Sequence, residues 1–316
     1  MRILVTGGAG FIGRWVVKGL LTRGYRVVAF DDLSNGRLVN IEEFRSNPGF
    51  EFIKGDIRDC QALSEIFAGE KVDRVYHLAA SINVQDSIDD PRTTFENDVA
   101  GTFNVLEEAR KYSCKVVFMS TCMVYDRSLD DAGINEEHAV KPASPYAASK
   151  LAGEALTLSY YHAYGLPTVV IRPFNTYGPF QKSSGEGGVV AIFLKRQLEG
   201  QSLNIYGNGN QTRDLLYVED CADFVIKTGF STEVDGQIIN AGLGQDVTIN
   251  ELAMMVRGSL DMIKHVPHIH PQSEIMKLLC NYDKARRLLD WNPKVSLEKG
   301  LELTGVWIKQ NPDLTT

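Results

Sequence analysis

Short apolar runs recur along the first half of the chain, and stretches with helical period separate most of them. The apolar runs, which predict strands, are Ile3–Thr6, Arg26–Phe30, Glu51–Ile53, Arg74–Leu78, Lys115–Met119 and Thr168–Ile171. The stretches with helical period are Phe11–Arg23, Gln61–Phe67, Thr93–Tyr112 and Tyr146–Tyr164. Strands that alternate with helices require a parallel sheet covered on both faces. The pattern therefore predicts a doubly wound α/β protein.

A glycine-rich turn follows the first strand and opens the first helix. It reads Thr6-Gly7-Gly8-Ala9-Gly10-Phe11-Ile12-Gly13. Gly7 permits a tight turn, Gly10 lets the backbone approach a pyrophosphate, and Gly13 lets the helix pack on the strand. The anion would lie on free amide groups at the helix N-terminus. The motif predicts a parallel Rossmann sheet that binds a dinucleotide.

The alternation loosens after Arg172-Pro173, where a Gly-rich stretch, Tyr177–Gly188, precedes separate helices. We interpret this part as a smaller α/β substrate-binding domain over the carboxyl edge of the sheet, where such folds bind ligands. The strand-like Gln237–Asn240 is expected to return to the sheet, so both domains are discontinuous. The dinucleotide-binding domain is expected to comprise residues 1–172 plus about 212–245, and the substrate-binding domain 173–211 plus about 246–316.

Acidic residues follow the second and third strands. Asp31 ends the second strand, where a carboxylate can accept hydrogen bonds from both ribose hydroxyls and repels a 2′-phosphate. NAD is therefore the expected cofactor and NADP is less favoured, although Arg37 lies close in sequence. Asp56 either contacts the adenine or is an ordinary loop carboxylate.

Tyr146 and Lys150 lie four positions apart in a helical stretch, so their side chains share one face. A phenol normally titrates near ~10, and a neighbouring cation favours the phenolate. The pair is expected to make a base that works near neutral pH. Because Tyr-x-x-x-Lys also arises by chance on amphipathic helices, its meaning depends on the dinucleotide motif before it. Together with Thr121 they indicate hydride chemistry on an alcohol.

Overall charge argues against a polyanion-binding surface. The 316 residues include 33 basic and 40 acidic ones, a net charge of -7, so nucleic acid is not an expected partner. Met1–Thr6 already has the pattern of a strand and leaves no room for a signal peptide, and no apolar run reaches the ~18 residues of a membrane span. No metal-ligand set is predicted. Five scattered cysteines indicate reduced thiols in a cytoplasmic protein: Cys60, Cys114, Cys122, Cys221 and Cys280.

The motifs together resemble the extended short-chain dehydrogenase/reductase family, specifically its nucleotide-sugar epimerase/dehydratase branch. They span nearly the whole chain: Thr6–Gly13, His77–Ala80, Ser120–Tyr125, Tyr146–Lys150, Arg172–Pro179 and Arg213-Asp214. The resemblance implies that Tyr146 removes the proton from the sugar O4 while NAD takes the C4 hydride. Lys150 would hold the nicotinamide ribose and lower the pKa of Tyr146, and Thr121 would hydrogen-bond the same sugar oxygen. The resemblance implies further cofactor contacts from Phe11, Ile12, Asp32, Ile57, Leu78, Ala79, Ala80 and Asn97.

For the substrate, the resemblance implies that Asn175 and Arg213 hold a diphosphate and that Val190 and Tyr206 add contacts. A guanidinium suits phosphate oxygens bidentately. Asn175 can instead be a turn residue before the sequence Tyr-Gly-Pro. A nucleotide-sugar substrate is therefore the expected small-molecule partner.

Two later segments carry further expectations. Gly185–Val190 resembles the nucleotide-cradling loop of UDP-sugar enzymes, and its Glu186 is more simply a solvated loop carboxylate than a catalytic one. Epimerases and dehydratases of the family commonly carry Arg-Pro-Gly before an acidic residue, where this chain has His270-Pro271-Gln272-Ser273-Glu274. Either His270 or Gln272 replaces the missing arginine, or one of them is a surface residue.

Cys122 and Met123 stand where the family's hexose 4,6-dehydratases carry an aspartate and a glutamate that act as acid and base. A thioether can do neither, so Met123 is expected to be part of the wall. Cys122 either exchanges a proton as a catalytic thiol or is an inert small hydrophobe, the commoner state of a buried cysteine. With an inert Cys122 the site resembles a 4-epimerase, which needs no acid or base beyond Tyr146.

Other segments favour dehydration. They resemble bacterial UDP-N-acetylglucosamine 4,6-dehydratases of nonulosonic-acid pathways: Thr121–Asp126, Arg172–Gln181, Gln211–Cys221 and His268–Ile275. The leading expectation is therefore an NAD-dependent dehydratase that acts on a UDP-N-acetylhexosamine, such as UDP-N-acetylglucosamine, with loss of water across C5–C6. The alternatives are a UDP-sugar 4-epimerase and a non-catalytic NAD-binding protein. The resemblance also implies a homodimer through a four-helix bundle, which helical periodicity alone cannot distinguish from helices packed on their own sheet.

Overall fold

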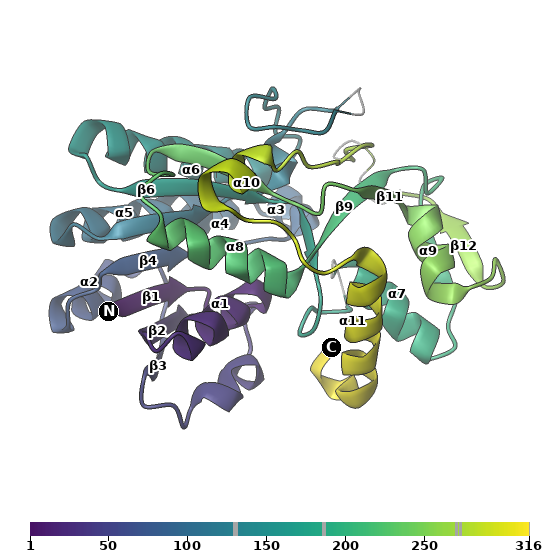
Figure 1. The fold of residues 1–316 in the computed structure, drawn as a ribbon, viewed down its shortest axis with the longest axis horizontal. Helices are drawn as coiled ribbons and strands as arrows, with labels where there is room; N and C mark the ends of the chain where they lie inside the picture. The colour runs from purple at the N-terminus through teal and green to yellow at the C-terminus, as the bar shows by residue number, and fades with distance from the viewer. Residues whose placement is uncertain (129–131, 185–187, 269–270, 272–273, 316) are drawn as a thin grey trace.

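The computed structural model describes residues 1–316 except 129–131, 185–187, 269–270, 272–273 and 316. A seven-stranded parallel sheet with the order β10-β6-β5-β4-β1-β2-β3 forms its centre (Figure 1). The strands are β1 (Arg2–Thr6), β2 (Arg26–Asp31), β3 (Phe50–Lys54), β4 (Arg74–His77), β5 (Lys115–Met119), β6 (Thr168–Pro173) and β10 (Gln237–Ala241). The predicted doubly wound α/β fold is confirmed, including the return of the chain to the sheet as β10, which pairs with β6.

Helices cover both faces of this sheet because its strands are apolar on both sides. In β1, Ile3 and Val5 join one buried cluster and Leu4 joins the other, as the alternation of side chains along a strand requires. The helices around the sheet are α1 (Phe11–Thr22), α2 (Cys60–Gly69), α3 (Val84–Asp89), α4 (Pro91–Phe95), α5 (Gly101–Tyr112), α6 (Pro145–Tyr164), α8 (Val218–Phe230) and α10 (Asp283–Leu289). Helices α1 and α8 lie on one face, and α2, α5 and α6 lie on the other (Figure 1).

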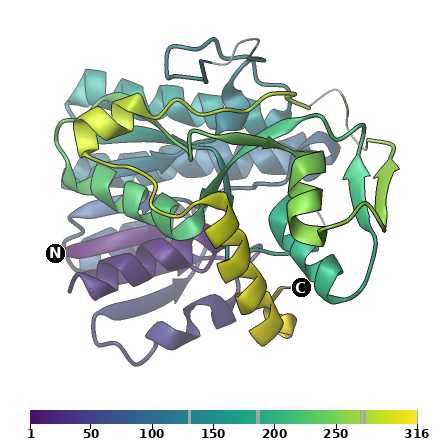
Figure 2. The same ribbon diagram turned by 45° about the vertical axis from the view of Figure 1, so that its right-hand side comes forward.

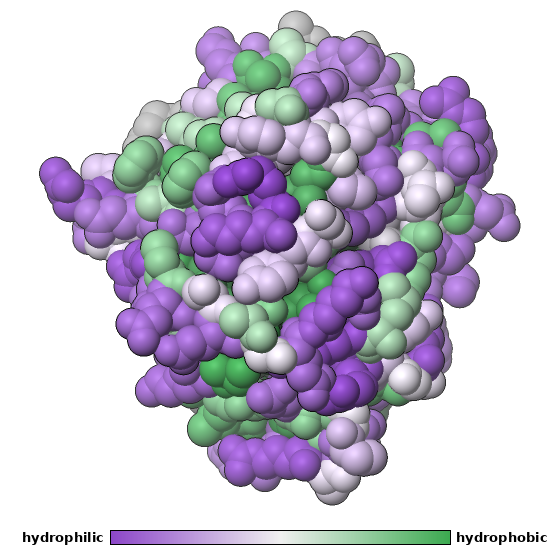
Figure 3. Space-filling view, turned by 90° about the vertical axis from the view of Figure 1, so that its left-hand side faces the viewer, coloured by the Kyte–Doolittle hydropathy of each residue, from purple (hydrophilic) through white to green (hydrophobic). Residues whose placement is uncertain are grey.

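The later part of the chain forms a smaller group of elements beside the carboxyl ends of the strands (Figure 2). Strand β9 (Thr212–Tyr217) pairs with β7 (Asn175–Tyr177) and β11 (Asp246–Thr248), and β8 (Leu203–Tyr206) pairs with β12 (Ile263–Val266). Three helices pack there around a third apolar cluster: α7 (Val189–Leu198), α9 (Ile249–Arg257) and α11 (Leu297–Gln310). The face at the amino ends of the large sheet is mostly hydrophilic, with small apolar groups scattered over it (Figure 3).

One expected helix departs from regular geometry. The predicted helix Thr93–Tyr112 is a longer helical path in which a π-helical turn, η2 (Glu96–Ala100), separates α4 from α5. Short 3-10 helices occur at η1 (Leu38–Phe44), η3 (Cys122–Val124) and η5 (Pro312–Thr315). Within the described part of the chain, no helix is long and apolar enough to cross a membrane.

Candidate active site

The glycine turn between β1 and α1 has the geometry that its sequence predicts. Gly7 has φ +69°, and a Cβ added there would lie 2.8 Å from the backbone nitrogen of Ala79. A Cβ on Gly13 would lie 2.0 Å from the carbonyl oxygen of Gly7. No side chain caps the first turn of α1, so its amide groups remain available to an anion. This turn therefore suits the pyrophosphate of a dinucleotide.

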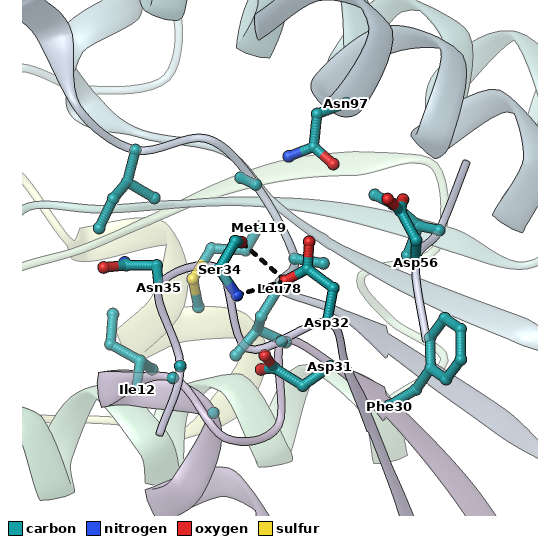
Figure 4. A pocket seen from close by; sticks show the side chains of 18 of the residues that line it. Ile12, Phe30, Asp31, Asp32, Ser34, Asn35, Asp56, Leu78, Asn97 and Met119 are labelled. Carbon is teal, nitrogen blue, oxygen red and sulfur yellow. Dashed lines mark hydrogen bonds between the residues drawn. The ribbon is translucent and has the colours of Figure 1, made fainter. Parts of the chain in front are cut away.

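A pocket opens over this turn at the carboxyl ends of the strands (Figure 4). Every residue predicted to bind the cofactor lines it except Tyr146 and Lys150, namely Gly7, Gly10, Phe11, Ile12, Gly13, Asp31, Asp32, Asp56, Ile57, Leu78, Ala79, Ala80 and Asn97. Sequence reasoning missed Phe30, Ser34, Asn35, Gly36, Gly55, Ile82 and Met119. The missed residues end strands or directly follow them, so the rule that ligands bind at the carboxyl ends of parallel strands could have found most of them.

The Asp31 carboxylate lies at the end of β2, held by backbone amides. The amide of Ala9 donates to Oδ2 at 3.0 Å, and that of Leu33 donates to Oδ1 at 2.9 Å. A Cβ on Gly36 would lie 2.7 Å from Oδ1, so the glycine leaves this carboxylate accessible. Burial raises the pKa of Asp31, and the two amides oppose that rise. Its remaining lone pairs suit the two hydroxyls of a ribose.

Two basic side chains near the pocket already have partners. Arg37 donates to the carbonyl oxygen of Leu314, which draws its guanidinium toward the C-terminal segment. Arg58 donates two hydrogen bonds to Oδ2 of Asp56, from Nε at 2.9 Å and from Nη2 at 2.5 Å. The hydrogen bonds from Arg58 hold the pKa of Asp56 below its usual range. Asp56 therefore lines the pocket as an ionised carboxylate.

Tyr146 and Thr121 come together from different elements. Ser144 caps α6 by accepting from the amide of Ala147 at 3.2 Å, which places Tyr146 in the first turn of the helix. The hydroxyls of Tyr146 and Thr121 share a hydrogen bond, and each residue is 8% exposed. Burial raises the pKa of Tyr146, whereas the bond to Thr121 lowers it. Loss of hydration therefore dominates, and the expected lowering of the Tyr146 pKa by Lys150 is not among the effects that act on the phenol within the described structure.

Lys150 lies one turn along α6 with its ammonium group inside the protein. Its Nζ donates to the carbonyl oxygen of Met119 at 2.9 Å and lies 5.2 Å from the centroid of the Phe118 ring. Burial lowers the pKa of Lys150, and Asp98 and Glu154 oppose that effect. Because Met119 lines the cofactor pocket, this lysine stands at the border between the pocket and Tyr146.

Cys122 begins η3, which is capped by the Thr121 hydroxyl accepting from the amide of Met123 at 3.2 Å. The cysteine is 2% exposed and belongs to an apolar cluster with Val124, Tyr125, Ile134, Phe174, Ile275, Leu278 and Cys280. Burial raises the pKa of its thiol to about 12. At neutral pH Cys122 is therefore a neutral thiol and cannot serve as a base.

Arg213 and Tyr206, two of the predicted substrate-binding residues, belong to a second polar group with Glu274 and His268. Arg213 pairs with the carboxylate of Glu274 and donates to the carbonyl oxygen of Ile275 at 2.9 Å. His268 approaches the other oxygen of Glu274 at 2.5 Å, and its ring lies 6.0 Å from that of Tyr206. Sequence reasoning did not assign a role to His268 or to Glu274, because their contact with Arg213 spans β9 and the segment after β12.

The other predicted substrate residues that the structure describes belong to α7 and β7. Val190 is buried in the first turn of α7. Asn175 begins β7, and its buried Oδ1 has no hydrogen-bond partner among the described residues. Glu186, His270 and Gln272 lie outside the described residues.

Residues 4–304 match the family described as GDP-mannose 4,6 dehydratase. The chain belongs to this family. It is one of the extended short-chain dehydrogenase/reductases, whose members include nucleotide-sugar epimerases and dehydratases.

Individual proteins are also similar over nearly the whole chain. A UDP-glucose 4-epimerase from Mycolicibacterium smegmatis is 38% identical over 96% of this chain and 97% of its own. The X-ray structure of Pal from Bacillus thuringiensis is 60% identical, with a TM-score of 0.97 over 98% of this chain and 99% of that one. A dTDP-glucose 4,6-dehydratase from Bacillus anthracis in complex with NAD is 30% identical, with a TM-score of 0.91 over 99% and 98%.

Proposed function

We propose that this protein oxidises the C4 hydroxyl of a UDP-sugar and returns the hydride within the same turnover, as an isomerase of the 4-epimerase type. The observation that carries the proposal is the hydrogen bond between Tyr146 and Thr121, with Lys150 one helical turn away at the edge of the cofactor pocket. A sugar hydroxyl that loses its proton requires a positioned base and a second group to orient the oxygen. Tyr146 and Thr121 have these properties.

NAD is the proposed cofactor, and NADP is disfavoured by the Asp31 carboxylate. The glycine turn supports this assignment, because Gly7 and Gly13 leave no room for a Cβ, and so does the amide-held Asp31. When bound, NAD would accept hydride from C4 and give it back. A related dehydratase structure is described as a complex with NAD.

The chain's own residues then handle the proton. Tyr146 takes the hydroxyl proton of O4 and later returns it, and Thr121 holds the oxygen in place. Lys150 contributes a positive charge beside the phenolate that forms. Arg213 can hold a diphosphate bidentately once the ligand displaces the carboxylate of Glu274 from its guanidinium.

Isomerisation is favoured over dehydration by the residues after Thr121. Elimination of water across C5–C6 needs a base at C5 and an acid at the C6 hydroxyl. Cys122 is neutral and buried among apolar side chains, and the Met123 thioether cannot exchange a proton. The 4-keto intermediate then rotates and accepts hydride on its other face.

Dehydration of a UDP-N-acetylhexosamine is the second candidate. The likeness to a dTDP-glucose 4,6-dehydratase over nearly the whole chain supports it, as do the dehydratase-like segments around Thr121 and His268. Under this candidate, the Cys122 thiol donates its proton to the departing C6 hydroxyl, and the thiolate that forms takes the proton from C5.

One experiment separates the candidates. The purified protein is incubated with NAD and either UDP-glucose or UDP-N-acetylglucosamine in deuterated water, and the products are analysed by mass spectrometry and NMR. Conversion to the C4 epimer at unchanged mass supports the proposal. Loss of water supports the second candidate. Tyr146→Phe abolishes either product while NAD still binds, and an active Tyr146→Phe enzyme would contradict both.

We also propose a homodimer and the two discontinuous domains described above. Exposed aromatic side chains support the dimer, because Phe95, Phe103 and Tyr164 occur on the helices α4, α5 and α6 that the four-helix bundle would use. A cytoplasmic location stays a prediction, and so does NAD in preference to NADP.

A further inference from the structure

The π-helical turn η2 lies beside the two catalytic candidates on α6. It places Asn97 on the wall of the cofactor pocket and buries its neighbour Asp98, which is 2% exposed. A π turn inserted in an α-helix is rare and is frequently found at functional sites. Asp98 was not among the residues that the sequence predicted to act.

The Asp98 carboxylate connects three segments of the site. Its Oδ1 accepts from the amide of Ser81 at 2.7 Å and from the side chain of Asn97 at 3.3 Å. Its Oδ2 accepts from the hydroxyl of Ser149 at 3.0 Å. Ser149 lies between the catalytic candidates in sequence and is also 2.8 Å from the carbonyl oxygen of Tyr146. Asp98 thus fixes the start of α6 against the loop after β4.

The hydrogen bonds do not require a charge. An asparagine at this position could accept from Ser81 through its oxygen and donate to Ser149 through its nitrogen. A buried carboxylate costs considerably more free energy than a buried amide unless a cation compensates it. The charge of Asp98 therefore needs a nearby cation. Lys150, the residue after Ser149 on α6, is that cation, and it acts on Asp98 through its charge and not through a direct ion pair.

Two carboxylates act on Lys150, and they differ in their other partners. Glu154 is paired with Arg172, whose Nε and Nη2 lie 2.8 Å and 2.5 Å from its oxygens. Among the described residues, Asp98 accepts hydrogen bonds only from uncharged donors. Burial raises the pKa of Asp98 and lowers that of Lys150, and the attraction between the two charges opposes both shifts. Burial and Lys150 together keep the nearby His77 neutral.

We propose that Asp98 is a positioning residue that compensates the buried charge of Lys150 and holds the first turns of α6 in place for C4 oxidation. This inference rests on the proposed function. The same negative charge also acts on Tyr146, whose phenolate it disfavours. Asp98 therefore sets the pH range in which Lys150 is charged and Tyr146 can release its proton.

Asp98→Asn tests the proposal because it removes the charge and retains the shape. Without Asp98, the pKa of Lys150 and the pKa of Tyr146 both fall, since the carboxylate raises both. In the profile of kcat against pH, the acid limb reports Tyr146 and the alkaline limb reports Lys150. Both limbs then move to lower pH, by about one unit. Asp89→Asn, which removes an exposed carboxylate on α3, is the matched control and leaves both limbs in place.

A second readout does not depend on turnover. NAD affinity is measured by calorimetry over the same pH range, where loss of the Lys150 charge weakens binding on the alkaline side. The alkaline midpoint is expected to fall by about one unit in Asp98→Asn. Asp98→Ser, which has a smaller side chain, repeats the measurement if the asparagine variant does not fold.

The outcomes are distinguishable. If the wild-type protein converts neither UDP-sugar, the proposed function fails, and the midpoints of NAD binding still decide the role of Asp98. A lower kcat with unmoved midpoints would show a purely structural residue and overturn the inference. A wild-type protein that does not bind NAD would also overturn the inference.

Discussion

The carboxylate of Glu154 and the guanidinium of Arg172 form a buried ion pair one helical turn beyond Lys150, with Oε2 and Nη2 2.5 Å apart. Both side chains are 3% exposed, and the Ser120 hydroxyl also donates to Glu154. Since Ser120 precedes Thr121, the pair joins β6, α6 and the catalytic end of β5. It supports the site without belonging to the pocket.

Breaking this pair is expected to destabilise the fold. Glu154→Gln leaves the Arg172 charge buried without its partner, which typically costs about 3–5 kcal/mol of unfolding free energy. Urea denaturation followed by circular dichroism measures the loss. The double variant Glu154→Gln/Arg172→Met is the control and should lose less, because no uncompensated charge remains. Equal losses in the two variants would show that the charge is not the cause.

The burial of Cys122 has a chemical consequence. With its pKa raised to about 12 by burial, the thiol should resist iodoacetamide at about pH 8, while the exposed Cys60 reacts. Peptide mass spectrometry after brief labelling checks this, with the protein in denaturant as the control in which both cysteines react. Rapid labelling of Cys122 in the folded protein would contradict the buried, neutral thiol.

Cys122→Ala separates the two candidate functions. If hydride simply returns to C4, the variant keeps its isomerase product, because no step uses the thiol. If the enzyme eliminates water, the variant retains C4 oxidation and loses the dehydrated product. Mass spectrometry of the products from UDP-N-acetylglucosamine distinguishes the two results. An isomerase activity abolished by this substitution would show that the thiol takes part in the proposed reaction.

The glycine turn predicts a sharp contrast between two substitutions. A methyl group on Gly13 meets the carbonyl oxygen of Gly7 at 2.0 Å, whereas one on Gly69, the last residue of α2, meets nothing within 4 Å. Gly13→Ala should weaken NAD binding by at least about tenfold and destabilise the fold by about 1–3 kcal/mol. Gly69→Ala should do neither. Calorimetric titration with NAD and thermal melting supply both measurements.

His77 predicts a pH dependence of stability. Burial, aided by Lys150, lowers its pKa from an ordinary 6.5 to about 3. Below about pH 6.5, His77 binds a proton in the unfolded chain but stays neutral in the folded chain until the pH approaches 3. The contribution of His77 to the free energy of unfolding is therefore fully present above pH 6.5 and is lost as the pH falls toward 3. The slope is at most about 1.4 kcal/mol per pH unit. Urea denaturation at several pH values should show a flatter slope in His77→Asn.

The hydrophobic periodicity of the sequence and the spacing of its N-terminal glycines predict most of the fold. The parallel sheet, the turn at Gly7–Gly13 and the return of β10 follow from local patterns that only one architecture satisfies. The helical phase that places Tyr146 and Lys150 on one face is equally local. These features were predictable because each depends on residues close together in the sequence.

Long-range contacts decide the rest. The sequence could not show that burial raises the pKa of Tyr146 or that Glu274 forms an ion pair with Arg213. Nor could it show that a π turn buries Asp98 near Lys150. Each depends on hydration and charge contributed by segments far apart in the chain. The sequence by itself determined the sheet, the dinucleotide turn and the Tyr–Lys pair. Only the tertiary structure decided the protonation environment of that pair, because the effect of a charge depends on distance and burial.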